Sequence, residues 1–355
     1  MDKIGFGIIG CGVISGTHRK AIEEVEAAEL VACCDIVEEK AKALAEEAGI
    51  GDSYYRDVEE MLQRDDLHAV SVCTPSGMHS EQAIMAAEAG KHILCEKPLD
   101  VTLKKIDDMI AAAERNDVKL AGVFQRRTYD STKRVREAVR TGKLGKLVMG
   151  DCYQKYFRSH EYYASGDWRA TWELDGGGAL MNQGVHGIDL IIHLMGPVAR
   201  VCAMCRRLVR NIAVEDTAAA LLEYENGALG VLEGTTSVTP GYGCKVEIHG
   251  DNGSIGLSGD NITMWDIPGE EEEGEAEEAA GEGTASDPTA LTATGHVAHV
   301  QDLCEAIMED REPAIPGHEA RKAVEVIKAI YKSSREGGAP VELPLSYVDD
   351  GPGIY

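Results

Sequence analysis

Short apolar runs alternate with amphipathic stretches through the first third of the chain. The apolar runs are rich in Ile, Val, Leu and Cys, which is typical of buried strands. The stretches between them have apolar residues at helical spacing. Such alternation is characteristic of a parallel sheet with right-handed crossovers, in which the strands end at one edge. The pattern predicts an α/β domain over 1–127 with strands at 4–9, 30–34, 69–73, 92–95 and 119–124 and helices at 17–26, 38–48, 80–89 and 103–115.

After about residue 127 the pattern changes to strands with little helix between them. Turn residues at Asn226-Gly227 and at 251–253 indicate hairpins. We therefore expect a second α/β domain over 128–355, built on a large and mainly antiparallel sheet with one helix inserted at 181–195. Amphipathic patterns predict two further helices at 299–309 and 317–335. The predicted strands lie at 147–157, 200–207, 217–224, 228–236, 244–249 and 254–257.

Composition adds limits on function. The chain has 355 residues, of which 44% are hydrophobic and 27% charged, as in ordinary globular proteins. The net charge of −26 repels phosphate backbones, so nucleic acid is not an expected partner, and an anionic ligand needs a local positive site. Because no apolar run approaches the ~18 residues of a membrane helix, no membrane association is expected. The acidic, glycine-bearing segment 268–288, with its Glu-rich part at 270–282, is interpreted as a surface loop.

The cysteines argue for a reduced, cytoplasmic protein. Several of the ten lie in apolar strand-like runs, where a free thiol packs as a small hydrophobe. Cys202 and Cys205 form a lone C-x-x-C without a second ligand pair, so a zinc site there is disfavoured. No metal is expected in this protein.

A glycine-rich turn follows the first predicted strand. Gly10 permits a tight turn, and Gly12 lets the backbone approach a pyrophosphate at the start of the next helix. Val13 and Ile14 complete this loop, and Ser15 replaces the usual third glycine. Asp35 ends the second strand, where a carboxylate accepts hydrogen bonds from the adenosine ribose and repels a 2′-phosphate. The sequence therefore predicts a Rossmann dinucleotide site that favours NAD over NADP.

Two clusters are candidates for catalysis. Glu96-Lys97-Pro98 ends the fourth strand at the edge where Rossmann ligands bind, so Lys97 could act as an acid or base at a carbinol. A Lys paired with Glu96 at a structural turn fits the same spacing. The second cluster, 175–189, opens a helix with a glycine run and places Asn182, His186 and Asp189 on one helical face. These polar groups could face a ligand, or His186 could be a satisfied core residue. Metal binding by His186 and Asp189 lacks a third ligand.

Nearly the whole chain resembles the Gfo/Idh/MocA family of glucose–fructose oxidoreductase and inositol dehydrogenase relatives. The resemblance rests on the Gly10-Cys-Gly12 loop, 72–75 followed by His79, the Gly-Lys-His-Ile-Leu-Cys-Glu-Lys-Pro stretch at 90–98, the glycine run with His186, and the segment from Arg321. It implies a Rossmann domain joined to an α/β domain with an open-faced sheet that mediates homo-oligomerisation to a dimer or tetramer.

The resemblance also implies roles for individual residues. Lys97 is the expected acid/base or contacts the reacting hydroxyl, and His186 binds or deprotonates the same group. Asn182 stands where many relatives have Asp and cannot take a proton, which places the base role on Lys97 and His186. Four further residues match positions that line the cofactor: Thr74, Pro75, His79 and Glu96. Another four match cofactor- or substrate-side positions in some branches only: Gln125, Arg127, Trp168 and Arg169.

The function these residues predict is NAD(P)-dependent hydride transfer at a secondary hydroxyl of a sugar, cyclitol or sugar derivative. Alternatives are a glycosidase that recycles tightly bound NAD, and a non-catalytic NAD- and sugar-sensing protein; retention of both Lys97 and His186 disfavours the sensor. The substrate stays open, although Tyr156, Arg158, Tyr162 and Trp172 suggest walls for a polyhydroxylated ligand.

Overall fold

The computed structural model describes residues 3–270 and 293–346. It divides into two compact units: unit 1 is Met1–Gln125 with Leu291–Arg321, and unit 2 is Arg126–Ala290 with Lys322–Tyr355. Most of the acidic segment 268–288 lies outside the described residues. Among the described residues, no helix has both the length and the apolar character needed to cross a bilayer.

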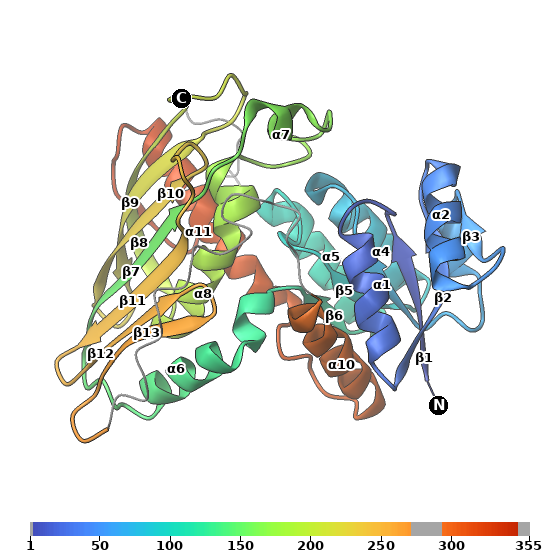
Figure 1. The fold of residues 1–355 in the computed structure, drawn as a ribbon, viewed down its shortest axis with the longest axis horizontal. Coiled ribbons are helices and arrows are strands. Elements are labelled where there is room, and N and C mark those ends of the chain that lie inside the picture. Colours follow the sequence, from blue (N-terminus) through green and yellow to red (C-terminus); the bar gives the residue numbers. More distant parts are fainter. Residues whose placement is uncertain (1–2, 271–292, 347–355) are drawn as a thin grey trace. The chain divides into compact units, whose positions relative to one another are not determined.

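Unit 1 is built on a parallel six-stranded sheet in the order β3-β2-β1-β4-β5-β6, which confirms the predicted Rossmann sheet (Figure 1). The order reverses between β1 and β4, so the crevice for a ligand lies beyond the carboxyl ends of these strands. The strands are β1 (Ile4–Ile9), β2 (Ala28–Cys34), β3 (Tyr54–Tyr55), β4 (Ala69–Val72), β5 (His92–Cys95) and β6 (Leu120–Gly122).

The helices of unit 1 follow the strands in the order that the sequence predicts. Two short elements, β3 and α3, lacked a recognisable pattern. The helices are α1 (Ser15–Glu24), α2 (Glu38–Ala48), α3 (Val58–Leu62), α4 (His79–Glu88), α5 (Leu103–Arg115) and α10 (Thr294–Met308), with a 3₁₀ turn at Ser76–Met78 and another, Gln125–Thr128, that starts at the last residue of the first segment.

Helix α10 belongs to unit 1 although it lies between the two chain segments of unit 2. Its Val300, Leu303 and Cys304 are fully buried and pack in one core with the β1 residues Ile4 and Phe6. Burying these side chains contributes roughly 1.5–3 kcal/mol for each large apolar residue, which explains the placement.

Unit 2 contains an eight-stranded sheet in the order β13-β12-β11-β7-β10-β9-β8-β14. Every neighbouring pair is antiparallel except β7 and β10, which confirms a mainly antiparallel sheet. The strands are β7 (Leu147–Lys155), β8 (Val198–Arg206), β9 (Thr217–Tyr224), β10 (Leu229–Thr235), β11 (Gly243–Gly250), β12 (Ser254–Ser258), β13 (Asn261–Asp266) and β14 (Val341–Glu342).

Helices α8 and α11 lie along one face of this sheet (Figure 1). Residues alternate between buried and more exposed along β8, β9 and β10, as expected of a sheet with one packed face. The helix predicted at 181–195 begins as a π-helix, η3 (Ala179–Gly184), before α8. The remaining helices are α6 (Asp130–Arg140), α7 (His160–Ala164), α8 (Val185–Met195) and α11 (Gly317–Arg335), which crosses the boundary between the units.

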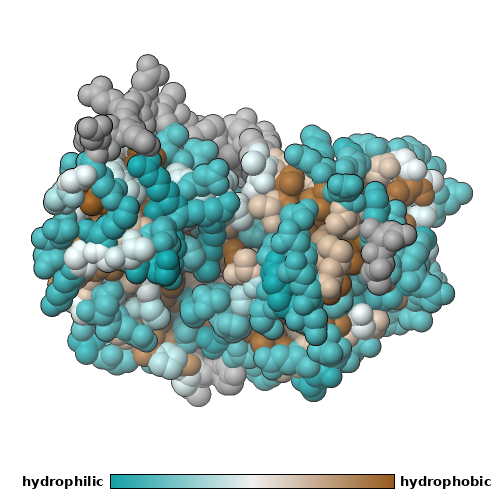
Figure 2. Space-filling model, turned by 90° about the horizontal axis from the view of Figure 1, so that it is seen from below, coloured by the Kyte–Doolittle hydropathy of each residue, from teal (hydrophilic) through white to brown (hydrophobic). Residues whose placement is uncertain are grey.

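The molecular face shown in Figure 2 is mainly hydrophilic, with scattered hydrophobic patches. This distribution agrees with a net charge of −26 spread over the chain.

Candidate active site

The glycine-rich loop of unit 1 has the geometry of a phosphate cradle. Gly10 adopts φ +92°, and a Cβ there would lie 2.8 Å from the backbone of Cys73, so the β1 turn requires glycine. At Gly12 a Cβ would have no heavy atom within 4 Å, which leaves space beside the backbone for a ligand. Ser15 donates its hydroxyl to the Gly12 carbonyl at 2.6 Å and begins α1, whose first turn contains no acidic residue. An anion is therefore favoured at this helix N-terminus.

Asp35 lies directly beside this loop. Its carboxylate accepts hydrogen bonds from the backbone N–H of Cys11 and of Val37, each at 2.8 Å. Two backbone donors thus fix the carboxylate at the carboxyl end of β2. The next residue, Ile36, and the loop residue Val13 are each 75% exposed, although both are large apolar side chains. Sequence reasoning did not assign Ile36; its exposure suits the face of an aromatic base.

The strand ends β4 and β5 are braced by His79. Its ring nitrogens lie 2.8 Å from the Pro98 carbonyl oxygen and 2.8 Å from the Thr74 carbonyl oxygen. Both contacts are hydrogen bonds only when each nitrogen carries a proton, since a carbonyl only accepts. His79 is 1% exposed, and the two contacts of its ring link the loop at Thr74 and Pro75 to the turn that follows Lys97. Gln125, at the end of unit 1, packs against Gly295 of α10.

Lys97 is half-buried at the end of β5, and Lys97-Pro98 is a cis peptide. The preceding Glu96 is almost fully buried, and its side chain contacts two histidines. Glu96 Oε1 lies 2.9 Å from His18 Nε2 and 3.1 Å from His296 Nε2, while Oε2 accepts the Lys97 N–H at 3.1 Å. Burial alone would raise the pKa of Glu96, but the hydrogen bonds from His18 and His296 outweigh it and hold the pKa well below its usual range.

In unit 2 the glycine run is shaped by Glu215. The Glu215 carboxylate accepts the N–H groups of Gly178 and Leu180 at 3.0 and 2.9 Å and the Tyr331 hydroxyl at 2.8 Å. A Cβ on Gly178 would lie 1.9 Å from the Glu215 carbonyl oxygen, and one on Gly177 would lie 2.1 Å from the Tyr331 hydroxyl. Glycine is therefore required at both positions, and Glu215 holds the start of η3.

The three polar residues predicted on one helical face lie in two different helical elements. Asn182 lies in the π-helix η3, where it donates to Asp175 Oδ1 at 2.6 Å, whereas His186 and Asp189 lie in α8. The π turn changes the residue spacing, so a continuous α-helical face does not form. Asp189 accepts a bidentate ion pair from Arg127 at 2.5 and 2.7 Å. His186 stays half-buried at the start of α8.

A cationic and aromatic group in unit 2 lies near Asn182. The Arg169 guanidinium lies 4.4 Å from the ring centroid of Tyr162 and 4.5 Å from that of Trp168, and it donates to the Tyr162 hydroxyl. Arg158 donates to Gln183 Oε1 at 2.7 Å. Gln183 in turn donates to Tyr162 and to Asn182. These contacts place two arginines around one tyrosine in the network of Asn182.

Two clusters contain residue types that bind metals. In unit 1, His18, Glu96 and His296 have ligand atoms within 4.8 Å of one another, but their N···O distances are hydrogen-bond lengths. The second cluster lies in unit 2 and consists of Asp151, Glu247 and His249. Asp151 already accepts the Val231 N–H, and His249 is hydrogen-bonded to the Ser254 hydroxyl.

All ten cysteines lie among the described residues and are free thiols. Cys202 and Cys205 stand an odd number of residues apart on β8 and so point to opposite faces of the sheet. They cannot chelate one ion together without disrupting β8.

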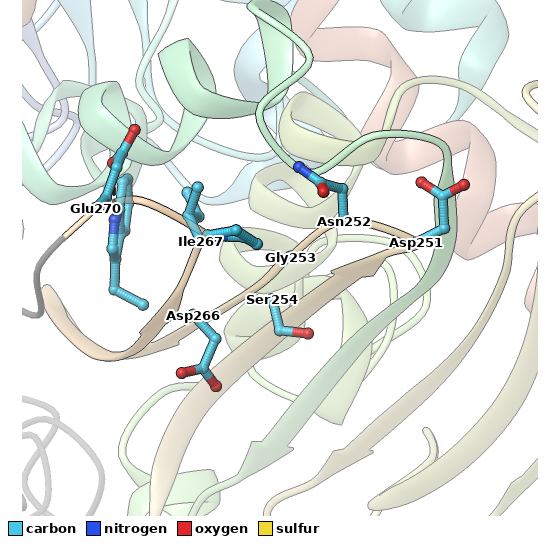
Figure 3. Close-up of a pocket in the computed structure, with 9 residues that line it drawn as sticks. Asp251, Asn252, Gly253, Ser254, Asp266, Ile267 and Glu270 are labelled. Atoms are coloured by element: carbon cyan, nitrogen blue, oxygen red, sulfur yellow. Dashed lines mark hydrogen bonds between the residues drawn. The ribbon is translucent and has the colours of Figure 1, made fainter.

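The pocket in Figure 3 belongs to unit 2, and its lining contains none of the predicted site residues. It has a volume of about 530 Å³ and is formed by the β11–β12 turn and the end of β13. Asp251 accepts the Lys146 N–H, and Glu270 pairs with Lys143. Figure 3 shows that the carboxylates of Asp251, Asp266 and Glu270 point in different directions, so the lining does not converge on one ligand group.

Together, the parallel sheet, the open loop at Gly12 and the fixed Asp35 define unit 1 as a nicotinamide-dinucleotide-binding Rossmann domain of an oxidoreductase. Residues 4–124 match the oxidoreductase family with an NAD-binding Rossmann fold, and residues 132–256 match the GFO/IDH/MocA C-terminal domain. The chain belongs to the Gfo/Idh/MocA family of oxidoreductases.

Named relatives cover most of the chain. Myo-inositol 2-dehydrogenase from Thermotoga maritima is 30% identical over 277 residues, which are 76% of this chain and 78% of that protein. D-apiose dehydrogenase from Paraburkholderia graminis is 28% identical over 93% of this chain and 87% of that protein. The crystal structure of the WlbA dehydrogenase from Bordetella pertussis, in complex with NADH and UDP-GlcNAcA, has a TM-score of 0.86 and 32% identity, covering 97% of this chain and 100% of that one.

Because Glu215 is buried, we expect the folding stability of the protein to depend on pH. Burial raises the pKa of Glu215 to about 7, while its hydrogen bonds to Leu180, Tyr331 and Gly178 only partly offset this. The folded state therefore holds a proton that the unfolded state releases near pH 4.5. The proton on Glu215 should therefore stabilise the folded state by on the order of 3 kcal/mol. We expect this contribution to the free energy of unfolding to be fully present below pH 4.5 and to be lost as the pH rises through about 7. Urea unfolding from pH 4.5 to 8 measures the slope, which Glu215→Gln should reduce; an unchanged slope would contradict the assignment.

Proposed function

We propose that this protein oxidises or reduces a secondary hydroxyl or keto group of a sugar, cyclitol or sugar derivative with NAD. Unit 1 holds the cofactor through Gly10, Gly12, Val13, Ile14 and Asp35. Unit 2 supplies substrate contacts. The observation that carries the proposal is the open space at Gly12 beside a carboxylate fixed for a ribose, with a lysine just beyond the carboxyl end of β5 in the same parallel sheet. When bound, the cofactor would supply the hydride acceptor for oxidation as NAD and the hydride donor for reduction as NADH.

The acid/base roles fall on Lys97 and His186. Lys97 follows the end of β5 at the ligand-binding edge of the sheet, and His186 lies in the first turn of α8, just after η3. In the proposed reaction both side chains hold the reacting hydroxyl, and one of them takes its proton as the C–H bond breaks. Asn182 cannot take a proton and donates to Asp175, so it orients substrate or neighbours only.

The substrate class is narrowed by the arginines of unit 2. Arg158 and Arg169 surround Tyr162 in a chain whose net charge is −26, so they supply a local positive site for an anionic group on a sugar. The relative from Bordetella pertussis was crystallised with a sugar nucleotide. A uronic acid or nucleotide sugar is therefore the substrate class we favour, with Trp168 and Arg169 in contact with it.

The test is a substrate screen in which turnover is monitored by the absorbance of reduced nicotinamide. Inositols, neutral sugars, uronic acids and UDP-sugars are each supplied with NAD, and the corresponding keto sugars with NADH. We expect stoichiometric formation of NADH or NAD on at least one of them. Glycoside cleavage without net NADH would instead support the glycosidase with recycled NAD. Binding of NAD and a sugar without any conversion would support the sensing protein.

Asp35 is proposed to select NAD over NADP. Its carboxylate is held by two backbone donors and would lie against a 2′-phosphate, where like charges repel. Asp35→Asn keeps the shape and removes the charge, so the ratio of kcat/KM for NAD to that for NADP should fall at least about 10-fold, which corresponds to 1.4 kcal/mol. Asp52→Ser, a change at an exposed carboxylate elsewhere in unit 1, should leave the ratio unchanged. An unaltered ratio in Asp35→Asn would remove this role.

The more exposed face of the unit 2 sheet is proposed to bind a second copy of the chain. Met204, Leu221 and Leu229 are 45%, 62% and 54% exposed, and β-sheet register places Leu221 opposite Cys202 on one side and Val231 on the other. A contiguous apolar face of this kind is typical of an interface between subunits. Light scattering should show a dimer or tetramer for the wild type and dissociation for Leu221→Glu. A wild-type monomer at micromolar concentration would contradict the proposal.

A further inference from the structure

Lys97 sits in a turn whose two flanking residues are both held by imidazoles. On one side the Pro98 carbonyl contacts His79, as described above. On the other side the Glu96 carboxylate is held by His18 and His296. His18 comes from α1, the helix that begins at the phosphate loop, and His296 comes from α10. The residue proposed to do the proton transfer is thus fixed by side chains from three separate elements of unit 1.

The protonation of the two histidines follows from their surroundings. His18 and His296 are 0% and 3% exposed, and their Nδ1 atoms are buried with no hydrogen-bond partner in the described part of the chain. A second proton on either ring would leave an unsatisfied N–H in the interior, which costs about 1–3 kcal/mol. Burial also lowers the pKa of His18. Each ring therefore donates its Nε2–H to the same oxygen of Glu96.

This assignment leaves the second oxygen of Glu96 for the backbone. Glu96 Oε1 receives both imidazole donors, and Oε2 accepts the N–H of Lys97 at 3.1 Å. An ionised carboxylate with three donors is a strong and directional acceptor. Removal of either imidazole frees the carboxylate to rotate and loosens the Lys97 backbone.

We propose that His18, Glu96 and His296 form a positioning cluster that fixes the backbone of Lys97 and ties its placement to the helix of the phosphate loop. None of the three is assigned to the chemistry itself; they act through Lys97. The inference rests on the proposed function of Lys97 for its effect on turnover. Its structural content, the held N–H of Lys97, can be tested without any substrate.

Two substitutions at His296 separate the effect of its hydrogen-bond donor from the effect of its side-chain volume. The Nε2 of Gln can replace the donor of His296, whereas Phe fills the same space without a donor. We expect His296→Phe to lower kcat by about 10–100-fold, as a displaced catalytic group does, with the Kd for NAD changed by less than about threefold. His296→Gln should restore most of that kcat. Equal kcat in the two variants would overturn the cluster.

Two further variants complete the experiment. Glu96→Gln keeps the volume but presents an N–H₂ group to one of the three donors, so it should lose kcat as His296→Phe does; wild-type kcat in Glu96→Gln would also overturn the proposal. It provides the test if His296→Phe does not fold. His92→Gln and His92→Phe are matched controls at the opposite end of β5, where His92 Nδ1 accepts the Lys119 N–H. Both should retain wild-type kcat.

Amide hydrogen exchange distinguishes failure of this inference from failure of the proposed function. The peptide that spans Lys97 should be protected in the wild type and in His296→Gln. It should exchange at least about 10-fold faster in Glu96→Gln and His296→Phe. If no sugar is turned over by the wild type but this exchange pattern is found, the positioning cluster stands and the reaction assigned to Lys97 fails. Uniform exchange in all four proteins refutes the cluster whatever the substrate.

Discussion

Replacement of Lys97 by Ala is expected to lower kcat by about 10²–10⁴-fold, the usual contribution of general acid–base catalysis, while the Kd for NAD stays within about threefold. The reason is that the proposed cofactor contacts, chiefly the Gly12 loop and Asp35, lie on other elements of unit 1. Stopped-flow absorbance of reduced nicotinamide measures kcat, and fluorescence titration measures NAD binding. Lys97→Arg keeps the positive charge but cannot release a proton near neutral pH, so it should be nearly as impaired.

Lys91→Ala is the matched control for this experiment. Lys91 precedes β5, and its ammonium donates to the carbonyl oxygens of Arg64 and Leu67. Its loss should lower thermal stability and leave kcat unchanged. If Lys97→Ala turned over substrate at the wild-type rate, Lys97 would be a structural turn residue, and the proposed mechanism would not hold.

The parts of the site that the sequence predicts are local in the chain. The loop from Gly10 to Ser15 and the strand that ends at Asp35 are short segments whose geometry is dictated by their own residues. Glycine at position 10 is favoured by its own φ of +92°, a backbone conformation that other residues rarely adopt. Strand and helix alternation likewise predicted the parallel sheet, because burial on both faces leaves a continuous apolar run for each strand.

The parts that the sequence does not predict depend on distant residues. His18 and His296 meet Glu96 across 78 and 200 positions, and no spacing rule connects them. Helix α10 lies between the two segments of unit 2 in the chain, yet it joins unit 1 because its apolar side chains complete a core that includes β1.

Contacts with distant residues also explain why the predicted helical face of Asn182, His186 and Asp189 differs from the structure. An α-helical period was assumed for a segment that starts as a π-helix, whose start is capped by Glu215 from another part of the chain. Asp189 was a candidate for ligand contact, but Arg127 pairs with it. Both differences arise from partners that lie more than thirty positions away in the sequence.

Gly12→Val is expected to abolish cofactor binding without harm to the fold. A Cβ at Gly12 meets no heavy atom within 4 Å, and Gly12 is not among the glycines with positive φ, so a side chain fits the backbone. The new isopropyl group would occupy the space that a pyrophosphate needs at the N-terminus of α1. We expect the Kd for NAD to rise at least about 100-fold, or roughly 2.7 kcal/mol, with an unchanged Tm.

Gly10→Ala supplies the contrast at the neighbouring glycine of the same loop. Its Cβ would lie 2.8 Å from the Cys73 backbone at φ +92°, so the cost falls on the fold itself and the Tm should drop by several degrees. Isothermal titration and thermal unfolding of both variants separate the two effects. If Gly12→Val bound NAD with wild-type affinity, the pyrophosphate of the cofactor would not bind against this loop. The assignment of unit 1 residues to the cofactor would then be wrong.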